Sequence, residues 1–184
     1  NAIADGSLEQ DPTLREAFDQ ARQGGRRLHL MGLLSDGGVH ALRTHVEALC
    51  HMAHRAGVEQ VFVHAFTDGR DADPRSGLGY AERFMQAVQG TGVRIATITG
   101  RYYAMDRDKR WERVAKAYEN LVHGRGIPVH DPLDAFRASY AADKTDEFIE
   151  PHVVVDAAGA PIATIRPNDV VICFNFRTDR CREI

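Results

Sequence analysis

The stretch RLHLMGLLSDGGVHALRTHVEALCHMAHRAGVEQVFVHAF (27–66) decides the fold. It begins with an apolar run at 27–34 and ends with a second one at 60–66, and each run has the length of a strand. Residues 41–57 between them show helical spacing of apolar side chains. This apolar face is formed by Leu42, Val46, Leu49 and Ala53. A strand, a helix and a second strand in this order predict a parallel pair of strands joined by a crossover.

The remainder of the chain continues this alternation of helices and strands. Further helices are predicted at 11–25, 77–90, 106–124 and 131–142. Further strands are predicted at 93–99 and 169–176, and the apolar run in the last of these predicts that it is buried. Together these elements predict a three-layer α/β/α domain with a mainly parallel sheet and helices on both of its faces.

Local patterns refine two of these elements and predict one more. The helix at 11–25 begins with Asp11 as a capping residue, and Pro12 suits its first turn. A short hairpin is predicted near residues 151–166, with the AAG of 157–159 as its turn. The helix at 106–124 shows one apolar stripe. That stripe consists of Trp111, Val114, Tyr118, Leu121 and Val122.

Composition indicates an ordinary globular protein of 184 residues, with 43% hydrophobic and 27% charged residues. No apolar stretch has the length of a membrane span, and the chain opens on polar residues without a signal peptide, so we expect a cytoplasmic location.

The net charge of −3 argues against nucleic-acid binding. Cys50, Cys173 and Cys181 are far apart without a CxxC pair, which indicates reduced thiols and no zinc site.

Both ends of the sequence suggest a piece of a longer protein. The chain does not begin with Met, and TDRCREI ends where a new helix would begin. We therefore expect residues 1–184 to form a single domain of a longer chain.

Four polar loops follow the predicted strands. They are SDGGVH (35–40), TDGRDADPR (67–75), TGRYYAMDRDKR (99–110) and NFRTDR (175–180). Right-handed crossovers bring the carboxyl ends of parallel strands to one edge of the sheet, and ligands bind outside that edge. The four loops therefore predict one polar site whose ligand is an anion.

Arginine is the residue type that makes an anion the expected ligand. Its guanidinium stays charged and binds phosphate or carboxylate through a planar fork of donors. The candidates are Arg70, Arg101, Arg107, Arg177 and Arg180. Gly37, Gly38 and Gly69 allow close backbone approach or a positive φ. Asp71 is a candidate for moving a proton to or from a hydroxyl.

Each loop also has a plain structural explanation. Residues 35–40 suit a simple turn between a strand and a helix, and the charges of 67–75 suit exposed ion pairs. Residues 106–113 suit the start of a helix with a solvated face, and Arg177 and Arg180 suit a solvated surface. A metal site within the chain is not expected, because His51 and His54 have no third ligand at useful spacing. The sequence also lacks GxGxxG and GxSxG, so it offers no dinucleotide fingerprint and no convincing nucleophile.

The loop motifs resemble a known family. LHLMGLLSDGGVH, HAFTDGRDADPRSG, IATITGRYYAMDRDKRWERVAKAY and VVICFNFRTDR are similar to the cofactor-independent (2,3-bisphosphoglycerate-independent) phosphoglycerate mutases. The resemblance runs from NAIADGSL to FNFRTDRCREI, nearly the whole chain. It implies a two-domain glycolytic enzyme, an isomerase that interconverts 3- and 2-phosphoglycerate.

The resemblance also implies how the enzyme is divided. An alkaline-phosphatase-like domain, absent here, would hold two manganese ions and a serine that carries the phosphoryl group. Residues 1–184 would be the inserted phosphotransferase domain, which binds substrate, holds no metal and is inactive alone. Its partners would be 2- or 3-phosphoglycerate and the metal domain, with neither nucleic acid nor a membrane.

By the same resemblance, Arg177 and Arg180 would bind the phosphate, and Asp71 would be the general acid or base for the glycerate hydroxyls. The glycerate part would be bound by His40, Arg70, Asp71, Arg101 and Arg107. A free-standing module that binds a phosphometabolite without catalysis is the alternative, and a nucleic-acid-binding domain is a third, less favoured hypothesis.

Overall fold

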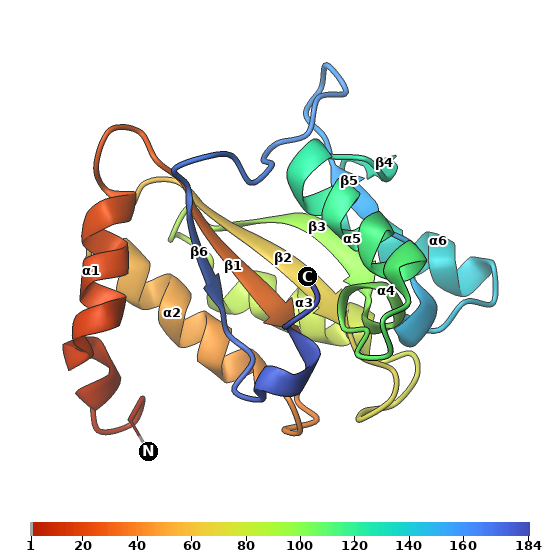
Figure 1. The fold of residues 1–184 in the computed structure, drawn as a ribbon, viewed down its shortest axis with the longest axis horizontal. Helices are drawn as coiled ribbons and strands as arrows, with labels where there is room; N and C mark the ends of the chain where they lie inside the picture. Colours follow the sequence, from red (N-terminus) through yellow and green to blue (C-terminus); the bar gives the residue numbers. More distant parts are fainter. Residues whose placement is uncertain (1) are drawn as a thin grey trace.

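The computed structural model describes residues 2–184 and contains one six-stranded sheet (Figure 1). The strands are β1 (Leu28–Leu33), β2 (Val61–Thr67), β3 (Arg94–Gly100), β4 (Ile127–Val129), β5 (His152–Val154) and β6 (Val170–Cys173). Their order across the sheet is β4-β5-β3-β2-β1-β6. Strands β6, β1, β2 and β3 are mutually parallel, as predicted, whereas β5 runs antiparallel to β3 and parallel to β4.

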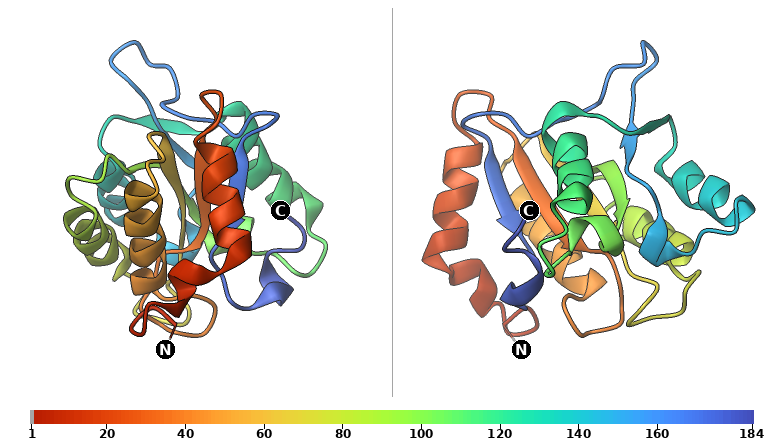
Figure 2. Two further views of the ribbon diagram at one scale, coloured as in Figure 1. Left: turned by 90° about the vertical axis from the view of Figure 1, so that its left-hand side faces the viewer. Right: turned by 45° about the vertical axis from the view of Figure 1, so that its right-hand side comes forward.

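Helices cover both faces of this sheet (Figures 1 and 2). They are α1 (Pro12–Ala21), α2 (Arg43–Arg55), α3 (Gly77–Ala87), α4 (Arg101–Ala104), α5 (Trp111–His123) and α6 (Pro132–Ala141). Helix α3 contacts both α2 and α6 in one layer, and α4 packs beside α5 on the opposite face. Helix α1 contacts β6 at the end of the sheet. The predicted three-layer architecture is therefore confirmed.

Three short 3₁₀ turns complete the described elements: η1 (Ser7–Gln10), η2 (Asp146–Phe148) and η3 (Thr178–Arg180). The beginnings of two helices follow the predicted capping chemistry. Asp11 Oδ1 accepts hydrogen bonds from the backbone N–H groups of Thr13 and Leu14 at 2.9 and 3.0 Å, ahead of α1. Asp131 caps α6 in the same way, and proline occupies the first turn of both helices.

The core lies mainly between the sheet and the layer of α2 and α3. Every residue of β2 is buried, and so are Leu28 and Leu30 of β1. Val46 and Leu49 of α2 pack against this surface, which confirms the helical face predicted from their spacing. Burying an aliphatic side chain contributes about 1.5–3 kcal/mol, so this core fixes the positions of the strands that lead to the loops.

Two predictions about burial are wrong. Strand β6 is not buried but lies at the edge of the sheet, where Val171 remains 40% exposed. In α5, Trp111 and Tyr118 are 57% and 49% exposed, although both belong to the predicted apolar stripe. The buried face contains Asn120 instead, because its side chain hydrogen-bonds Thr99 and the carbonyl of His152 beneath the helix.

The predicted hairpin forms only in part. The turn at 157–159 is present, and Asp156 Oδ1 accepts hydrogen bonds from the backbone of Ala158 and Ala160. A single bridge between Val155 and Pro161 closes it, while β5 pairs with β3 and β4 of the main sheet. The sequence did not predict β4, because a strand of three residues is too short to show a period.

Candidate functional site at the carboxyl edge of the sheet

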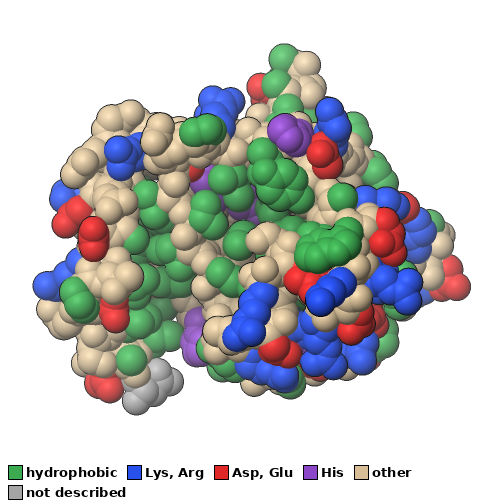
Figure 3. Space-filling view, in the orientation of Figure 1, with side chains coloured by type: hydrophobic (Ala, Val, Ile, Leu, Met, Phe, Trp, Pro, Cys, Tyr) green, Lys and Arg blue, Asp and Glu red, His purple; other side chains and the backbone are tan. Residues whose placement is uncertain are grey.

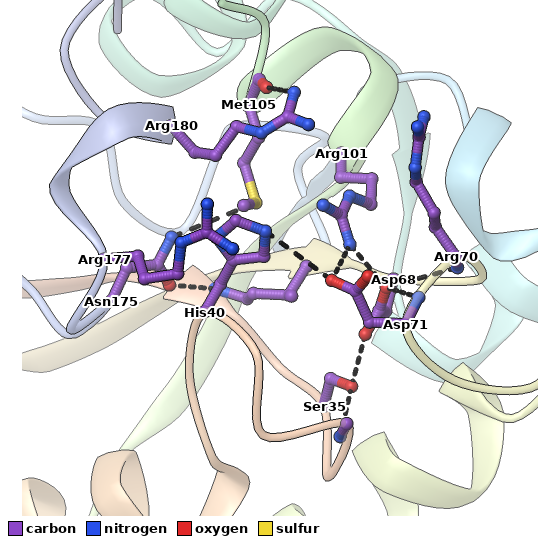
Figure 4. Close-up of polar contacts among 12 residues, drawn as sticks. Ser35, His40, Asp68, Arg70, Asp71, Arg101, Met105, Asn175, Arg177 and Arg180 are labelled. Carbon is purple, nitrogen blue, oxygen red and sulfur yellow. Dashed lines mark hydrogen bonds and ion pairs between the residues drawn. The ribbon is translucent and has the colours of Figure 1, made fainter.

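The four polar loops meet at the carboxyl edge of the sheet, the lower edge in Figure 1. Two contacts tie them together across the sheet. The backbone N–H of Phe176, after β6, donates to the carbonyl of His40, after β1, at 2.9 Å. Arg101, after β3, binds Asp68 and Asp71, which follow β2. Figure 4 shows the side chains of His40, Asp71 and Arg101 converging from loops that follow separate strands. The parallel topology thus joins loops that are far apart in the sequence.

Asp68 is the centre of the hydrogen bonds that shape the site. Its Oδ2 accepts from Ser35 Oγ at 2.6 Å, and its Oδ1 accepts from Arg101 Nη1 at 2.7 Å and from the backbone of Asp71 at 2.9 Å. Only 1% of its surface is exposed. Burial alone would raise the pKa of Asp68, but the bonds from Ser35, Asp71 and Arg101 lower it overall, so the carboxylate is ionised.

Arg101 connects Asp68 with Asp71. The same Nη1 atom donates to Asp71 Oδ2 at 2.6 Å, and the His40 Nε2 lies 3.6 Å from that oxygen. Burial lowers the pKa of His40, and the positive charges of Arg101 and Arg177 lower it further, which favours the neutral imidazole. Among the described residues, His40 Nδ1 has no hydrogen-bond partner although it is buried. The imidazole therefore has a polar atom free for a ligand.

Arg107, Arg177 and Arg180 form the outer part of the site. Asp179 Oδ2 lies 3.0 Å from Arg177 and 3.4 Å from Arg107, while Arg180 Nη1 donates to the carbonyl of Met105 at 3.2 Å. Burial lowers the pKa of Arg180, and the nearby charges of Arg107, Arg101 and Arg70 lower it further. This mutual repulsion would be relieved by a bound anion.

Arg70 lies at the rim, apart from the other predicted arginines (Figure 4). Its side chain is 59% exposed and lies 3.5 Å from Glu147. Arg70, Arg101 and Arg180 nevertheless line one cavity of about 330 Å³, with Tyr102 and Phe148 among the other lining residues. Lys and Arg side chains gather in the same lower region of the face drawn in Figure 3. All the predicted site residues therefore lie at one edge, with Arg70 turned outward.

Two glycines allow the loops to approach so closely. A Cβ atom on Gly37 would lie 2.8 Å from the carbonyl oxygen of Asp71. Gly69 has a φ of +66°, and a Cβ there would lie 2.7 Å from the backbone nitrogen of Glu147. The predicted roles of these two glycines, close approach and positive φ, are confirmed.

Sequence reasoning missed three residues that support the site. Ser35 and Asp68 bind each other, and Asn175 Oδ1 accepts from the backbone of Leu33 at 2.9 Å. Ser35 and Asn175 are the first polar residues after the apolar runs that form β1 and β6, and Asp68 follows β2 directly. That shared position was the available signal, because the first polar groups beyond buried strands need partners inside the protein.

Side chains of the types that could bind a metal ion occur among the described residues. Within residues 2–184, no group of three or more His, Cys, Asp or Glu side chains is arranged to hold a metal ion. In the same range, no helix is long and apolar enough to cross a membrane.

Comparison with known proteins identifies the family. The family described as "BPG-independent PGAM N-terminus" matches residues 1–184, which is the whole chain. The chain belongs to this family. This confirms the resemblance drawn from the loop motifs.

Relatives in this family are much longer than the chain. The 2,3-bisphosphoglycerate-independent phosphoglycerate mutases of Thermomicrobium roseum and Flavobacterium johnsoniae are 54% and 50% identical to it over its full length. The chain spans 35% and 36% of their lengths. The fold also matches that of Leishmania mexicana phosphoglycerate mutase, from crystal structures at low cobalt concentration, with a TM-score of 0.92 and 32% sequence identity. The match covers 99% of the present chain and 35% of the Leishmania chain.

Proposed function

We propose that residues 1–184 are the substrate-binding, phosphotransferase domain of a phosphoglycerate mutase that interconverts 3- and 2-phosphoglycerate. One observation carries this proposal: four loops bring Arg101, Arg107, Arg177 and Arg180 together around Asp71 and His40, with Arg70 at the rim. A phosphoglycerate carries a phosphate and a carboxylate, and clustered guanidinium groups are suited to bind both anions.

The substrate has two chemically different ends and a hydroxyl between them. Arg177 and Arg180, which follow β6, would bind the phosphate. Arg70, Arg101 and Arg107 would bind the glycerate, and the neutral imidazole of His40 would add a hydrogen bond. Closure of the two domains over the bound substrate would exclude water. This exclusion is needed because water in the site would hydrolyse the phosphate ester, and the phosphoryl group would then not be transferred.

Asp71 is the proposed general acid or base. Its carboxylate is partly exposed and lies between Arg101 and His40, within reach of a hydroxyl bound in the same site. Arg101 would be displaced in part when substrate arrives, since its Nη1 serves both Asp68 and Asp71. Asp68 remains the fixed anchor, and Asp71 becomes free to take or return the hydroxyl proton.

The remaining chemistry belongs to other parts of the longer protein in this proposal. The resemblance implies a serine that carries the phosphoryl group and two manganese ions, supplied by an alkaline-phosphatase-like domain. The side chains of residues 2–184 do not fit such ions, because no suitable ligand group is present among them. The relatives are nearly three times as long as this chain, which leaves room for that domain. The proposed setting is cytoplasmic, with neither nucleic acid nor membrane as a partner.

The proposal is tested by titrating isotope-labelled protein with 3-phosphoglycerate at low salt and following backbone amide shifts by NMR. Shifts confined to loops 35–40, 67–75, 99–110 and 175–180 are expected. Shifts centred elsewhere in the protein would contradict the site. Inorganic sulfate at equal ionic strength is the matched control, because it offers one anion without the glycerate part.

A second assay separates the mutase from a free-standing anion-binding module. We expect the complete protein to convert 3- to 2-phosphoglycerate, and residues 1–184 alone to bind the substrate without turnover. Turnover by residues 1–184 alone would overturn the division of labour. Binding without turnover by the complete protein would favour the module that only binds a phosphometabolite.

A further inference from the structure

Asp146 is a fully buried carboxylate that the proposed chemistry does not use. It begins the 3₁₀ turn η2, and it contacts the segment that joins β2 to α3. That segment, residues 67–77, carries Arg70 and Asp71 of the candidate site. Burying a carboxylate is costly unless its oxygens are hydrogen-bonded, so the partners of Asp146 indicate what it stabilises.

Asp146 bonds the segment 67–77 at three points. Its carbonyl accepts from the Thr67 hydroxyl at 2.6 Å, and its backbone N–H donates to the carbonyl of Pro74 at 2.8 Å. Its Oδ2 accepts from the backbone N–H of Gly77 at 2.7 Å. One residue therefore fixes both ends of the segment and a point between them.

Glycine occupies two positions of this segment that face Asp146. A Cβ atom on Gly77 would lie 2.8 Å from Asp146 Cγ, and one on Gly69 would lie 3.0 Å from Asp146 Cβ. Both separations are shorter than the usual contact between carbon atoms, which is about 3.5–4.0 Å. The segment and η2 therefore lie closer together than a side chain at either position would allow.

The carboxylate of Asp146 also caps helix α3 from another part of the chain. The side chain of Ser76, the residue before the helix, donates to a backbone carbonyl instead of accepting from an N–H of the helix. Asp146 accepts from the first of these N–H groups, that of Gly77. The Tyr140 hydroxyl donates to Asp146 Oδ1 and accepts from the N–H of Leu78 at 3.3 Å. Because a helix N-terminus has unpaired N–H groups and favours negative charge, these bonds stabilise the point where the segment enters α3.

We propose that Asp146 is a positioning residue that fixes Asp71 in the candidate site through the segment 67–77. Thr67, which is bonded to Asp146, directly precedes Asp68. The Oδ1 of Asp68 accepts in turn from the Asp71 backbone at 2.9 Å. A general acid or base must lie within about 2.6–3.2 Å of the proton that it moves, so displacement of the segment would take Asp71 out of reach. The inference rests on the proposed function, in which Asp71 is that acid or base.

The first test is a double-mutant cycle in the complete protein, with mutase turnover as the readout. Asp146→Asn keeps the size of the side chain and should lower turnover by about 10- to 100-fold, since a misplacement of about 1 Å can cost 10²-fold. In a protein that already carries Asp71→Asn, the same change should have almost no further effect, because residues that act as a unit are not additive. Equal losses in the two backgrounds would overturn the proposal.

The protonation state of Asp146 sets the pH of this assay. Burial raises the pKa of Asp146 to about 6, although the hydrogen bonds from Tyr140 and Gly77 act in the opposite direction. At about pH 8 the carboxylate is therefore ionised and accepts both bonds, so the cycle compares an intact cap with an altered one.

Asp169→Asn is the matched control. The Asp169 side chain is 8% exposed and accepts from the backbone N–H groups of Arg27 and Arg166, but it lies before β6, at the opposite edge of the sheet. This variant should lower the free energy of unfolding in urea and leave turnover unchanged. If it lowers turnover as much as Asp146→Asn does, Asp146 has only a structural role and the proposal fails.

A second measurement is independent of the mutase reaction. NMR relaxation of backbone amides in residues 1–184 should show greater mobility of residues 68–76 in Asp146→Asn than in Asp169→Asn. Tyr140→Phe, which leaves the bond from Gly77 to Asp146, should increase this mobility less, and it replaces Asp146→Asn in both tests if that variant does not fold.

The two measurements separate the inference from the proposed function. Unchanged mobility of residues 68–76 in both Asp146→Asn and Tyr140→Phe would overturn the positioning role. Increased mobility in these variants, with no mutase turnover by the unaltered complete protein, would contradict the proposed function and leave Asp146 as the residue that fixes Asp71.

Discussion

Two clusters of histidine and aspartate lie on the same sheet, and they differ in what they leave unpaired. One is the edge cluster of His40, Asp68, Asp71 and Arg101 at the carboxyl ends of the strands. The other is the inner chain of Asp169, His29, His64 and Thr97, which runs from the residue before β6 across β1, β2 and β3. Sequence alone gives both clusters similar residue types, so only their surroundings distinguish them.

The inner chain is sealed. His29 Nε2 lies 3.0 Å from Asp169, His29 Nδ1 lies 2.9 Å from His64, and His64 Nδ1 lies 2.9 Å from the Thr97 hydroxyl. Both histidines are fully buried, and all four of their ring nitrogens have protein partners. A cluster in which each ring nitrogen has a partner within the protein has no group left for a ligand.

The edge cluster is open by contrast. His40 Nδ1 and, beside the cluster, Arg180 Nε have no partner among the described residues. Burial lowers the pKa of Arg180, and the positive charges of nearby arginines lower it further. Unpaired groups and excess charge of one sign mark a place where a ligand completes the interactions. The difference teaches that the groups left unpaired at a site, more than its residue types, indicate function.

The largest expected effect is on turnover, from Asp71→Asn in the complete protein. Loss of a general acid or base lowers turnover by about 10²–10⁴-fold. The substrate affinity should change less, because asparagine retains the size and one acceptor. Steady-state kinetics measure both the turnover and the substrate affinity. The control is Asp73→Asn, which changes an exposed neighbouring aspartate. An affinity that collapses while turnover holds would contradict the proton-transfer role.

Asp68→Ala tests whether the edge cluster depends on its buried anchor. The change leaves the Arg101 guanidinium, 4% exposed, without its Asp68 partner. Removing one partner of a buried ion pair costs about 3–5 kcal/mol of unfolding free energy. Urea unfolding measures it, and Asp143→Ala, which removes a carboxylate that is 95% exposed, is the control expected to cost about 0–1 kcal/mol. Equal losses in the two variants would contradict the anchoring role.

Arg180→Ala tests the open charge of the edge. A charge-assisted hydrogen bond contributes about 1.5–3 kcal/mol, so 3-phosphoglycerate binding should weaken by about 10- to 150-fold. The exposed Arg166→Ala removes the same charge elsewhere and serves as the control in the same calorimetric titration. Equal weakening by both variants would mean that overall charge, and not this site, attracts the substrate.

The inner chain predicts a pH dependence of stability. Burial lowers the pKa of His64 to about 3 from the usual value of 6.5. Below pH 6.5 the unfolded chain binds a proton at His64 that the folded protein does not bind. This histidine therefore lowers the free energy of unfolding by about 1.4 kcal/mol for each pH unit between 6.5 and about 3. Urea unfolding at several pH values should give a shallower slope for His64→Gln than for the protein or for the exposed His54→Gln. Parallel slopes for all three would refute this.

The architecture and, except for Asp68, the edge cluster could be predicted from sequence because both follow from strong local patterns. Each parallel strand is a mainly apolar run, and each is followed by a loop that contains Asp together with Gly, Arg or both. The rule that parallel strands place their carboxyl ends together then brings Asp71, Arg101 and Arg180 into one region without any knowledge of distances.

What could not be predicted depends on long-range partners. The burial of Asn120 follows from partners in β3 and β5, and the sealed chain of His29 and His64 requires the register of β1 beside β2. The exposure of β6 follows from its place at the end of the strand order, which no spacing along the chain reveals. Short strands such as β4 add no period of their own.

The smallest expected effect sharpens the comparison most directly. Arg70 belongs to the edge cluster by sequence, yet its side chain is 59% exposed and its partner Glu147 lies 3.5 Å away. An exposed pair of this kind contributes about 0–1 kcal/mol, so Arg70→Ala should leave the urea-unfolding free energy nearly unchanged. The same variant should weaken 3-phosphoglycerate binding. Arg70→Lys should weaken it less, because lysine keeps the positive charge but lacks the planar fork of guanidinium donors. Loss of stability with unchanged binding would make Arg70 a structural residue, and the edge cluster would then end at Asp71.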